Sequence, residues 1–153
     1  IDVAEPLEST QTSPRKARML YHNGLWRQMR NYLGMCLFVS WSPKQLCEAV
    51  EAVCGWPMSH WRLMKTAERG ATLAKTFHLR EGFSQADDIL PARFFSPPSE
   101  SPLRDSGIDR KAFNTAREIY YQMMGWDLQG VPTYARLVEL GIEWAEQYID
   151  RKG

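Results

Sequence analysis

Helix start and stop signals recur along most of the chain and leave little sequence for strands. The clearest set begins at Ser42, a capping residue, with Pro43 at the first helical position and Gln45 completing a capping box. Gly55 ends that segment. Only the short run at 37–39 (Leu-Phe-Val) has β character. We therefore predict an all-α fold, an irregular bundle of five or six helices.

The same kind of signal places the other helices. Apolar residues spaced three and four apart predict helical segments, and capping residues and glycines mark where several of them begin and end. These helices are expected at residues 14–33, 59–79, 109–124, 133–141 and 142–151.

The stretch from about residue 81 to 109 breaks this pattern, because prolines and glycines interrupt it repeatedly. A connection this long in a small domain usually has a function or packs over another surface. We predict one long ordered loop here. Residues 1–14 are polar and are expected to form an extended linker, which leaves a single helical domain at 15–153. A chain that starts in this way is expected to be cut from a larger protein or processed to a mature form.

Composition narrows the functional classes. The 153 residues carry a formal net charge of +1, which gives little support for a nucleic-acid partner. No apolar run approaches the roughly 20 residues that a membrane-spanning helix needs, so no membrane partner is expected. Three cysteines make an odd and sparse set, and reduced thiols in the cytoplasm are the expectation.

Large apolar side chains are unusually frequent. The chain has six Trp, six Tyr, six Phe and seven Met, more than so small a domain is expected to bury completely. We therefore expect an exposed apolar face that serves as a docking surface. The same face could support a homo-oligomer.

Cys36 is the main candidate for metal chemistry, because it lies two residues after the glycine that ends the first predicted helix. A thiolate near exposed backbone N–H groups can bind iron or another soft metal. An iron–sulfur cluster normally takes four protein ligands, so any partners of Cys36 would lie on another polypeptide or another part of the protein. Cys47 and Cys54 are seven residues apart on one predicted helix, and we interpret both as core residues.

The adjacent carboxylates of Asp87 and Asp88 could indicate acid–base chemistry, but we favour a structural role as turn caps or as partners of Arg80, Arg93 or Arg104. The three histidines show no metal-binding spacing and are expected at the surface or at helix ends. No phosphate-binding loop, nucleophile elbow or zinc-protease helix motif is present in the sequence.

Three stretches, in order and with matching spacing, resemble the aldehyde ferredoxin oxidoreductase family of tungsten pterin enzymes. Residues 31–36 (Asn-Tyr-Leu-Gly-Met-Cys) resemble the family motif D-x-x-G-L-C. Residues 80–94 resemble R-E-G-F-T-R-x-D-D-x-L-P-x-R-F, and residues 120–133 are similar to Y-Y-x-x-x-G-W-D-x-x-G-V-P-T. The resemblance spans roughly residues 15–142, so the chain looks like the last, C-terminal domain of such an enzyme.

The resemblance implies a tungsten (or molybdenum) bis-pyranopterin and a 4Fe-4S cluster in the intact enzyme, which would oxidise aldehydes and pass electrons to ferredoxin. It implies that Cys36 is the fourth cluster ligand, and that the other three come from a C-x-x-C-x-x-x-C motif in the missing N-terminal domains. Asn31, Gly34 and Leu37 would contact a pterin. Asn31 replaces the family aspartate, so a neutral amide stands where the family has an anion.

By this interpretation the chain alone should be inactive and should hold no cofactor. The alternative is a non-enzymatic helical protein-interaction module that binds a partner helix through its Trp- and Met-rich face. The position of Cys36 distinguishes the two: exposure beside a loop favours the cofactor domain, and deep burial in the core favours the module.

Overall fold

The computed structural model describes residues 7–8, 11–97, 99–100, 102 and 104–149. Within these residues the chain is all-α, as predicted, and its only β feature is an isolated bridge between Trp126 and Pro132. The α-helices are α1 (Pro14–Tyr32), α2 (Pro43–Cys54), α3 (His60–Arg80), α4 (Arg110–Met123) and α5 (Tyr134–Glu139). Three short 3-10 helices are η1 (Gln85–Asp87), η2 (Ala92–Phe94) and η3 (Glu143–Tyr148).

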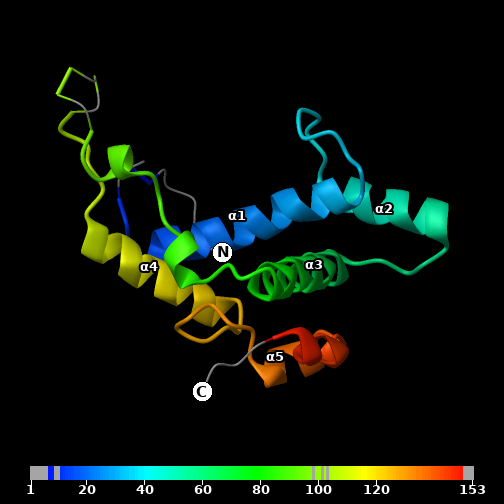
Figure 1. The fold of residues 1–153 in the computed structure, drawn as a ribbon. Helices are drawn as coiled ribbons and strands as arrows, with labels where there is room; N and C mark the ends of the chain where they lie inside the picture. The colour runs from blue at the N-terminus through cyan, green and yellow to red at the C-terminus, as the bar shows by residue number, and fades with distance from the viewer. Residues whose placement is uncertain (1–6, 9–10, 98, 101, 103, 150–153) are drawn as a thin grey trace.

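Helix α1 is the central element, and it packs along α3 on one side and against α4 on another (Figure 1). Its buried face is formed by Ala17, Tyr21, Leu25 and Met29, four residues apart, which is the period of one helical stripe. Tyr21, Leu25 and Met29 join the main hydrophobic core with residues of α2, α3 and α4. A second, smaller core lies under α5 and η3, around the side chains of Leu137, Leu140, Ile142 and Ile149.

The capping box that the sequence predicts at the start of α2 is present. The Ser42 hydroxyl accepts from the backbone N–H of Gln45, and the Gln45 side chain accepts from the N–H of Ser42 at 2.9 Å. Ser13, Ser59, Asp109 and Thr133 cap the other four α-helices through their side chains. Such caps satisfy N–H groups that have no partner within the helix.

Two predictions about the ends of elements need correction. The tail, predicted as a helix over 142–151, forms only the 3-10 helix η3, and its last two predicted residues lie outside the described part of the chain. Cys54 is exposed and so is not a core residue, whereas Cys47 packs against the main core. Cys54 is the last residue of α2, and the buried stripe of that helix, Leu46 and Val50, ends one turn earlier.

The loop predicted over 81–109 contains η1 and η2, and its first half crosses from the end of α3 to the side of α4 (Figure 1). The predicted linker lies largely outside the described residues, and α1 begins at Pro14. None of the described helices is both long and apolar enough to cross a lipid bilayer.

Candidate functional site

The candidate site lies on the loop that joins α1 to α2, which stands away from the helices in Figure 1 (cyan). Helix α1 ends in a Schellman motif, in which the N–H of Met35 bonds to the carbonyl of Arg30 at 2.9 Å and the N–H of Gly34 to that of Asn31 at 3.0 Å. Gly34 has φ +67, a left-handed conformation that glycine adopts at little cost. This turn directs the chain out of α1 and sets the position of Cys36.

The four predicted site residues lie at the end of α1 and on the first part of this loop. Asn31 lies in the last turn of α1, while Gly34, Cys36 and Leu37 follow within six residues, and all four are exposed. A side chain added at Gly34 would meet nothing within 4 Å, so the surface around it is open. The exposure of Cys36 agrees with the cofactor-domain hypothesis and not with a thiol buried in the domain's own core.

The local chemistry suits a thiolate ligand to an anionic cluster. Within the described residues, the backbone N–H groups of Cys36, Leu37 and Phe38 have no hydrogen-bond partner. Backbone N–H groups of this kind can bond to cluster or cysteine sulfur and raise the reduction potential of the cluster. The residues present therefore fit a contribution of one ligand together with nearby N–H donors.

One cysteine does not make a metal site. Among the described residues, no group of three or more His, Cys, Asp or Glu side chains is close enough to hold a metal ion. If Cys36 binds a cluster, the other ligands must come from outside this part of the protein. Of the three histidines, His60 and His78 are exposed, and His22 is half-buried on α1.

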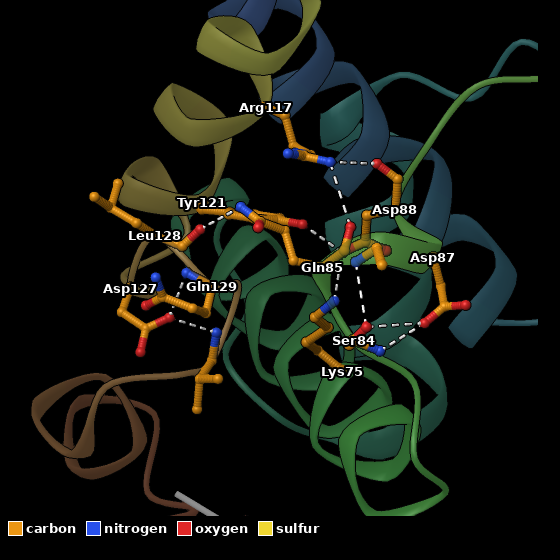
Figure 2. Close-up of polar contacts among 12 residues, drawn as sticks. Lys75, Ser84, Gln85, Asp87, Asp88, Arg117, Tyr121, Asp127, Leu128 and Gln129 are labelled. Carbon is orange, nitrogen blue, oxygen red and sulfur yellow. Dashed lines mark hydrogen bonds and ion pairs between the residues drawn. The ribbon is translucent and has the colours of Figure 1, made fainter. Parts of the chain in front are cut away.

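Asp88 lies at the centre of a second polar cluster, shown in Figure 2, which fixes the long loop to two helices. Its Oδ2 accepts from the Nζ of Lys75 on α3 and from the hydroxyl of Tyr121 on α4, each at 2.5 Å. Arg117 donates to the carbonyls of Gln85 and Asp88. The ammonium of Lys75 also lies 5.6 Å from the centre of the Tyr121 ring.

The predicted arginine partners of Asp88 are therefore wrong. Arg80 pairs with Glu81, Arg104 pairs with Asp105, and Arg93 lies over the Phe94 ring. The predicted turn cap is present at Asp87, which accepts from the N–H of Ser84 at 2.8 Å. Lys75 was missed because it is a lysine on the inner face of a helix and gives no local signal of its partner in the sequence.

The electrostatics of this cluster indicate a structural role. Burial alone would raise the pKa of the Asp88 carboxyl, but the bonds from Lys75 and Tyr121 and the charges of Lys75 and Arg117 outweigh it and lower that pKa. Burial, together with the bond to Asp88, raises the pKa of Tyr121. An ionised carboxylate that is bonded in this way is a poor general acid, and we assign it no chemistry.

A similar cluster around Glu68 attaches α5 to the main bundle. Glu68 is 6% exposed and accepts from Tyr21 of α1, Lys65 of α3 and Arg136 of α5, at 2.5, 2.7 and 2.7 Å. Burial would raise the pKa of Glu68, and the three donors lower it overall. Glu139 accepts from both Lys65 and Arg136 and completes the cluster.

The comparisons with known proteins agree with the sequence resemblance. The sequence model described as aldehyde ferredoxin oxidoreductase, domains 2 and 3, matches residues 2–142. The aliphatic sulfonate oxidoreductase, WOR-like subunit, of Pyrococcus furiosus is 32% identical over 65 residues, covering 42% of this chain and 10% of that protein.

A similar fold occurs in a solved structure, the active site complex BamBC of benzoyl coenzyme A reductase with 1,5-dienoyl-CoA. The TM-score is 0.73 at 22% sequence identity, and the match covers 96% of this chain and 23% of that one. The chain therefore spans a tenth of the first relative's length and less than a quarter of the second's.

Proposed function

The chain belongs to the aldehyde ferredoxin oxidoreductase family, and from this premise we propose that it is the C-terminal cofactor-binding domain of a tungsten or molybdenum bis-pyranopterin oxidoreductase. In this proposal the parent enzyme oxidises an aldehyde to a carboxylic acid and uses ferredoxin as electron acceptor. A cytoplasmic location, suggested by three free thiols, is part of the same proposal.

Cys36 supplies one ligand to a 4Fe-4S cluster. The observation that carries this assignment is the exposed thiol of Cys36 on the loop that aligns with the family's cysteine motif, with unpartnered N–H groups around it in the described part of the chain. The cofactor pair, when bound, would supply two-electron chemistry at the metal and single-electron transfer through the cluster.

The chain's own residues hold and shield the cofactors in this proposal. Asn31, exposed at the end of α1, presents its amide oxygen to pterin N–H donors, more weakly than the family's aspartate would because the amide carries no charge. The exposed backbone at Gly34 lets a flat ring approach closely, since nothing lies within 4 Å of a side chain added there. Leu37 adds an apolar contact and excludes water.

The decisive experiment is iron and tungsten analysis of the full-length enzyme carrying Cys36→Ala. We expect lost or altered cluster iron and a changed EPR spectrum, because one of four ligands is removed. Cys54→Ala is the matched control, since Cys54 is also a free, exposed thiol but lies at the end of α2. Unchanged iron, spectrum and activity in Cys36→Ala would refute the ligand role.

The isolated 153-residue chain should show no aldehyde oxidation and bind no cluster after iron–sulfur reconstitution, because it contributes a single ligand. Full activity of the isolated chain would contradict this part of the proposal. The alternative, a non-enzymatic interaction module, is not favoured, because the family match covers residues 2–142 and Cys36 is not buried in the domain's core.

A further inference from the structure

The loop between α1 and α2 ends in an apolar tip, which we define as Leu37, Phe38 and Val39. All three side chains are exposed, and Phe38 is 99% exposed, more than any other large apolar residue among those described. Burying a phenylalanine side chain away from water is strongly favourable, and an exposed phenylalanine forgoes that free energy. Its complete exposure beside a candidate ligand therefore points to a partner surface.

Both ends of this loop are anchored to the domain. Met35 and Trp41, on either side of the tip, pack against the main core. The N–H of Trp41 bonds to the carbonyl of Val39 at 3.0 Å, and the capping box at Ser42 follows directly. The tip is thus presented in an organised conformation, which lowers the entropy cost of docking.

The loop also lacks charge. Residues 31–43 contain no Lys, Arg, Asp or Glu, although such residues make up 24% of the chain. Charged residues are depleted in the cores of protein interfaces, where aromatic anchors are enriched. The tip therefore suits a dry, apolar recess better than a hydrated or charged surface.

We propose that Phe38 anchors the Cys36 loop by docking into an uncharged apolar recess on the rest of the same enzyme. The chain spans only 10% and 23% of the two relatives, so both relatives have several times more protein than this domain, and we take the partner surface to come from that part. Phe38 is a positioning residue, which holds Cys36 at the cluster and keeps water from it. The identity of the partner rests on the proposed function.

Hydroxyl-radical footprinting tests the docking directly. Oxidation of Phe38 is compared by mass spectrometry between the 153-residue chain and the intact enzyme, with the urea-unfolded enzyme as the reference for full reactivity. We expect Phe38 to react at close to the full rate in the chain and about tenfold more slowly in the intact enzyme, because interface cores exclude water. Equal reactivity in the two would overturn the inference. So would protection that appears only in concentrated solutions of the chain, since a second copy would then be the partner.

Variants of the intact enzyme test the positioning role. Phe38→Ala should bind normal iron at the start but lose it to a chelator several-fold faster, with a shifted cluster potential, while Phe38→Leu should restore most of the retention. Val53→Ala, which truncates an exposed apolar residue of α2, is the control and should match the wild type. Identical iron release in Phe38→Ala and the wild type would count against the inference.

The two proposals can fail separately. If Cys36→Ala keeps all its iron while Phe38 is protected in the intact enzyme, the ligand role of Cys36 is refuted and the docking of Phe38 is supported. If Cys36→Ala loses iron while Phe38 remains fully reactive, the ligand role of Cys36 is supported and the docking of Phe38 is refuted. In the isolated chain, Phe38→Ala should leave the unfolding midpoint unchanged, because this side chain is almost fully exposed there.

Discussion

The Nζ of Lys75 lies 2.5 Å from the Oδ2 of Asp88, and this pair joins α3 to the long loop. The Lys75 side chain is 7% exposed and the Asp88 side chain 40%. A buried ammonium without its anion is costly, so the pair holds the loop in place. The tyrosine of α4 that shares the same carboxylate oxygen extends this attachment to a third element.

Replacing Asp88 with Asn should destabilise the chain by about 1–3 kcal/mol, because the ammonium of Lys75 would keep its burial and lose its counter-charge. This loss of stability is smaller than for a fully buried ion pair, because Asp88 is partly exposed to solvent. Urea unfolding of the purified chain measures the change. Asp105→Asn removes the carboxylate of an exposed pair with Arg104 and should leave the midpoint in place. Equal midpoints for both variants would contradict the prediction.

Acid should destabilise the fold through Asp88 and Glu68. Their ordinary pKa values are 3.8 and 4.5, and both are lowered in the folded chain. The stabilisation is therefore complete above the ordinary values and is lost as the pH falls through the folded values. We expect the free energy of unfolding to decline steadily below about pH 4.5. The decline should be shallower in Asp88→Asn, and an increase in stability between pH 5 and pH 3 would exclude this account.

Glu68→Gln should loosen α5 from the bundle. The substitution removes the anion that Lys65 and Arg136 share, and a loss of about 3 kcal/mol is expected for breaking a buried network. Hydrogen exchange should speed up most in α5, which Arg136 links to Glu68, and in η3, which packs against α5. Glu48→Gln breaks an exposed pair with Lys44 at 3.6 Å and is the control, with no measurable change expected. Uniform exchange across the chain in Glu68→Gln would argue against a local effect.

Substitution by alanine at two glycines, Gly24 and Gly34, should change the stability of the fold in opposite directions. Neither Gly24 nor Gly34 has any atom within 4 Å of an added side chain. Gly24 is inside α1, so Gly24→Ala should stabilise by about 0.5–1 kcal/mol. Gly34 has φ +67, so Gly34→Ala should destabilise by about 1 kcal/mol. Thermal unfolding of both variants tests the contrast, and changes of the same sign would show that backbone strain at Gly34 is not the cause.

Local signals were enough to predict the helices. A capping box or a glycine stop acts on neighbours three to five residues away, so Ser42, Gln45 and Gly55 identified α2 from the sequence alone. The tail was wrongly predicted as an α-helix. The spacing of the buried residues Ile142, Ala145 and Ile149 is compatible with a 3-10 helix as well as with an α-helix. The exposure of Cys54 was not predictable, because its spacing from Cys47 gives the helix face but not the point at which packing against that face ends.

The candidate loop was predictable because its features lie within a few consecutive residues, from Asn31 to Leu37. The partner of Asp88 was not, since Tyr121 is 33 residues away in the chain and Lys75 is 13 away in the opposite direction. Only the packing of α3 and α4 brings these side chains to one carboxylate. The ligand role of Cys36 stays a prediction, because no group of three or more possible metal ligands is found among the described residues.

The length of helix α1 affects how far Cys36, just beyond its end, moves when the helix tilts. It is a rod of about 28 Å, because each of its 19 residues adds roughly 1.5 Å. The Schellman turn connects the loop directly to this rod. If α1 tilted by a few degrees about its contact with α4, the sulfur of Cys36 would therefore move by an appreciable fraction of a bond length. If Cys36 binds a cluster as proposed, substitutions on α4 should therefore change the rate of electron transfer without touching the cluster.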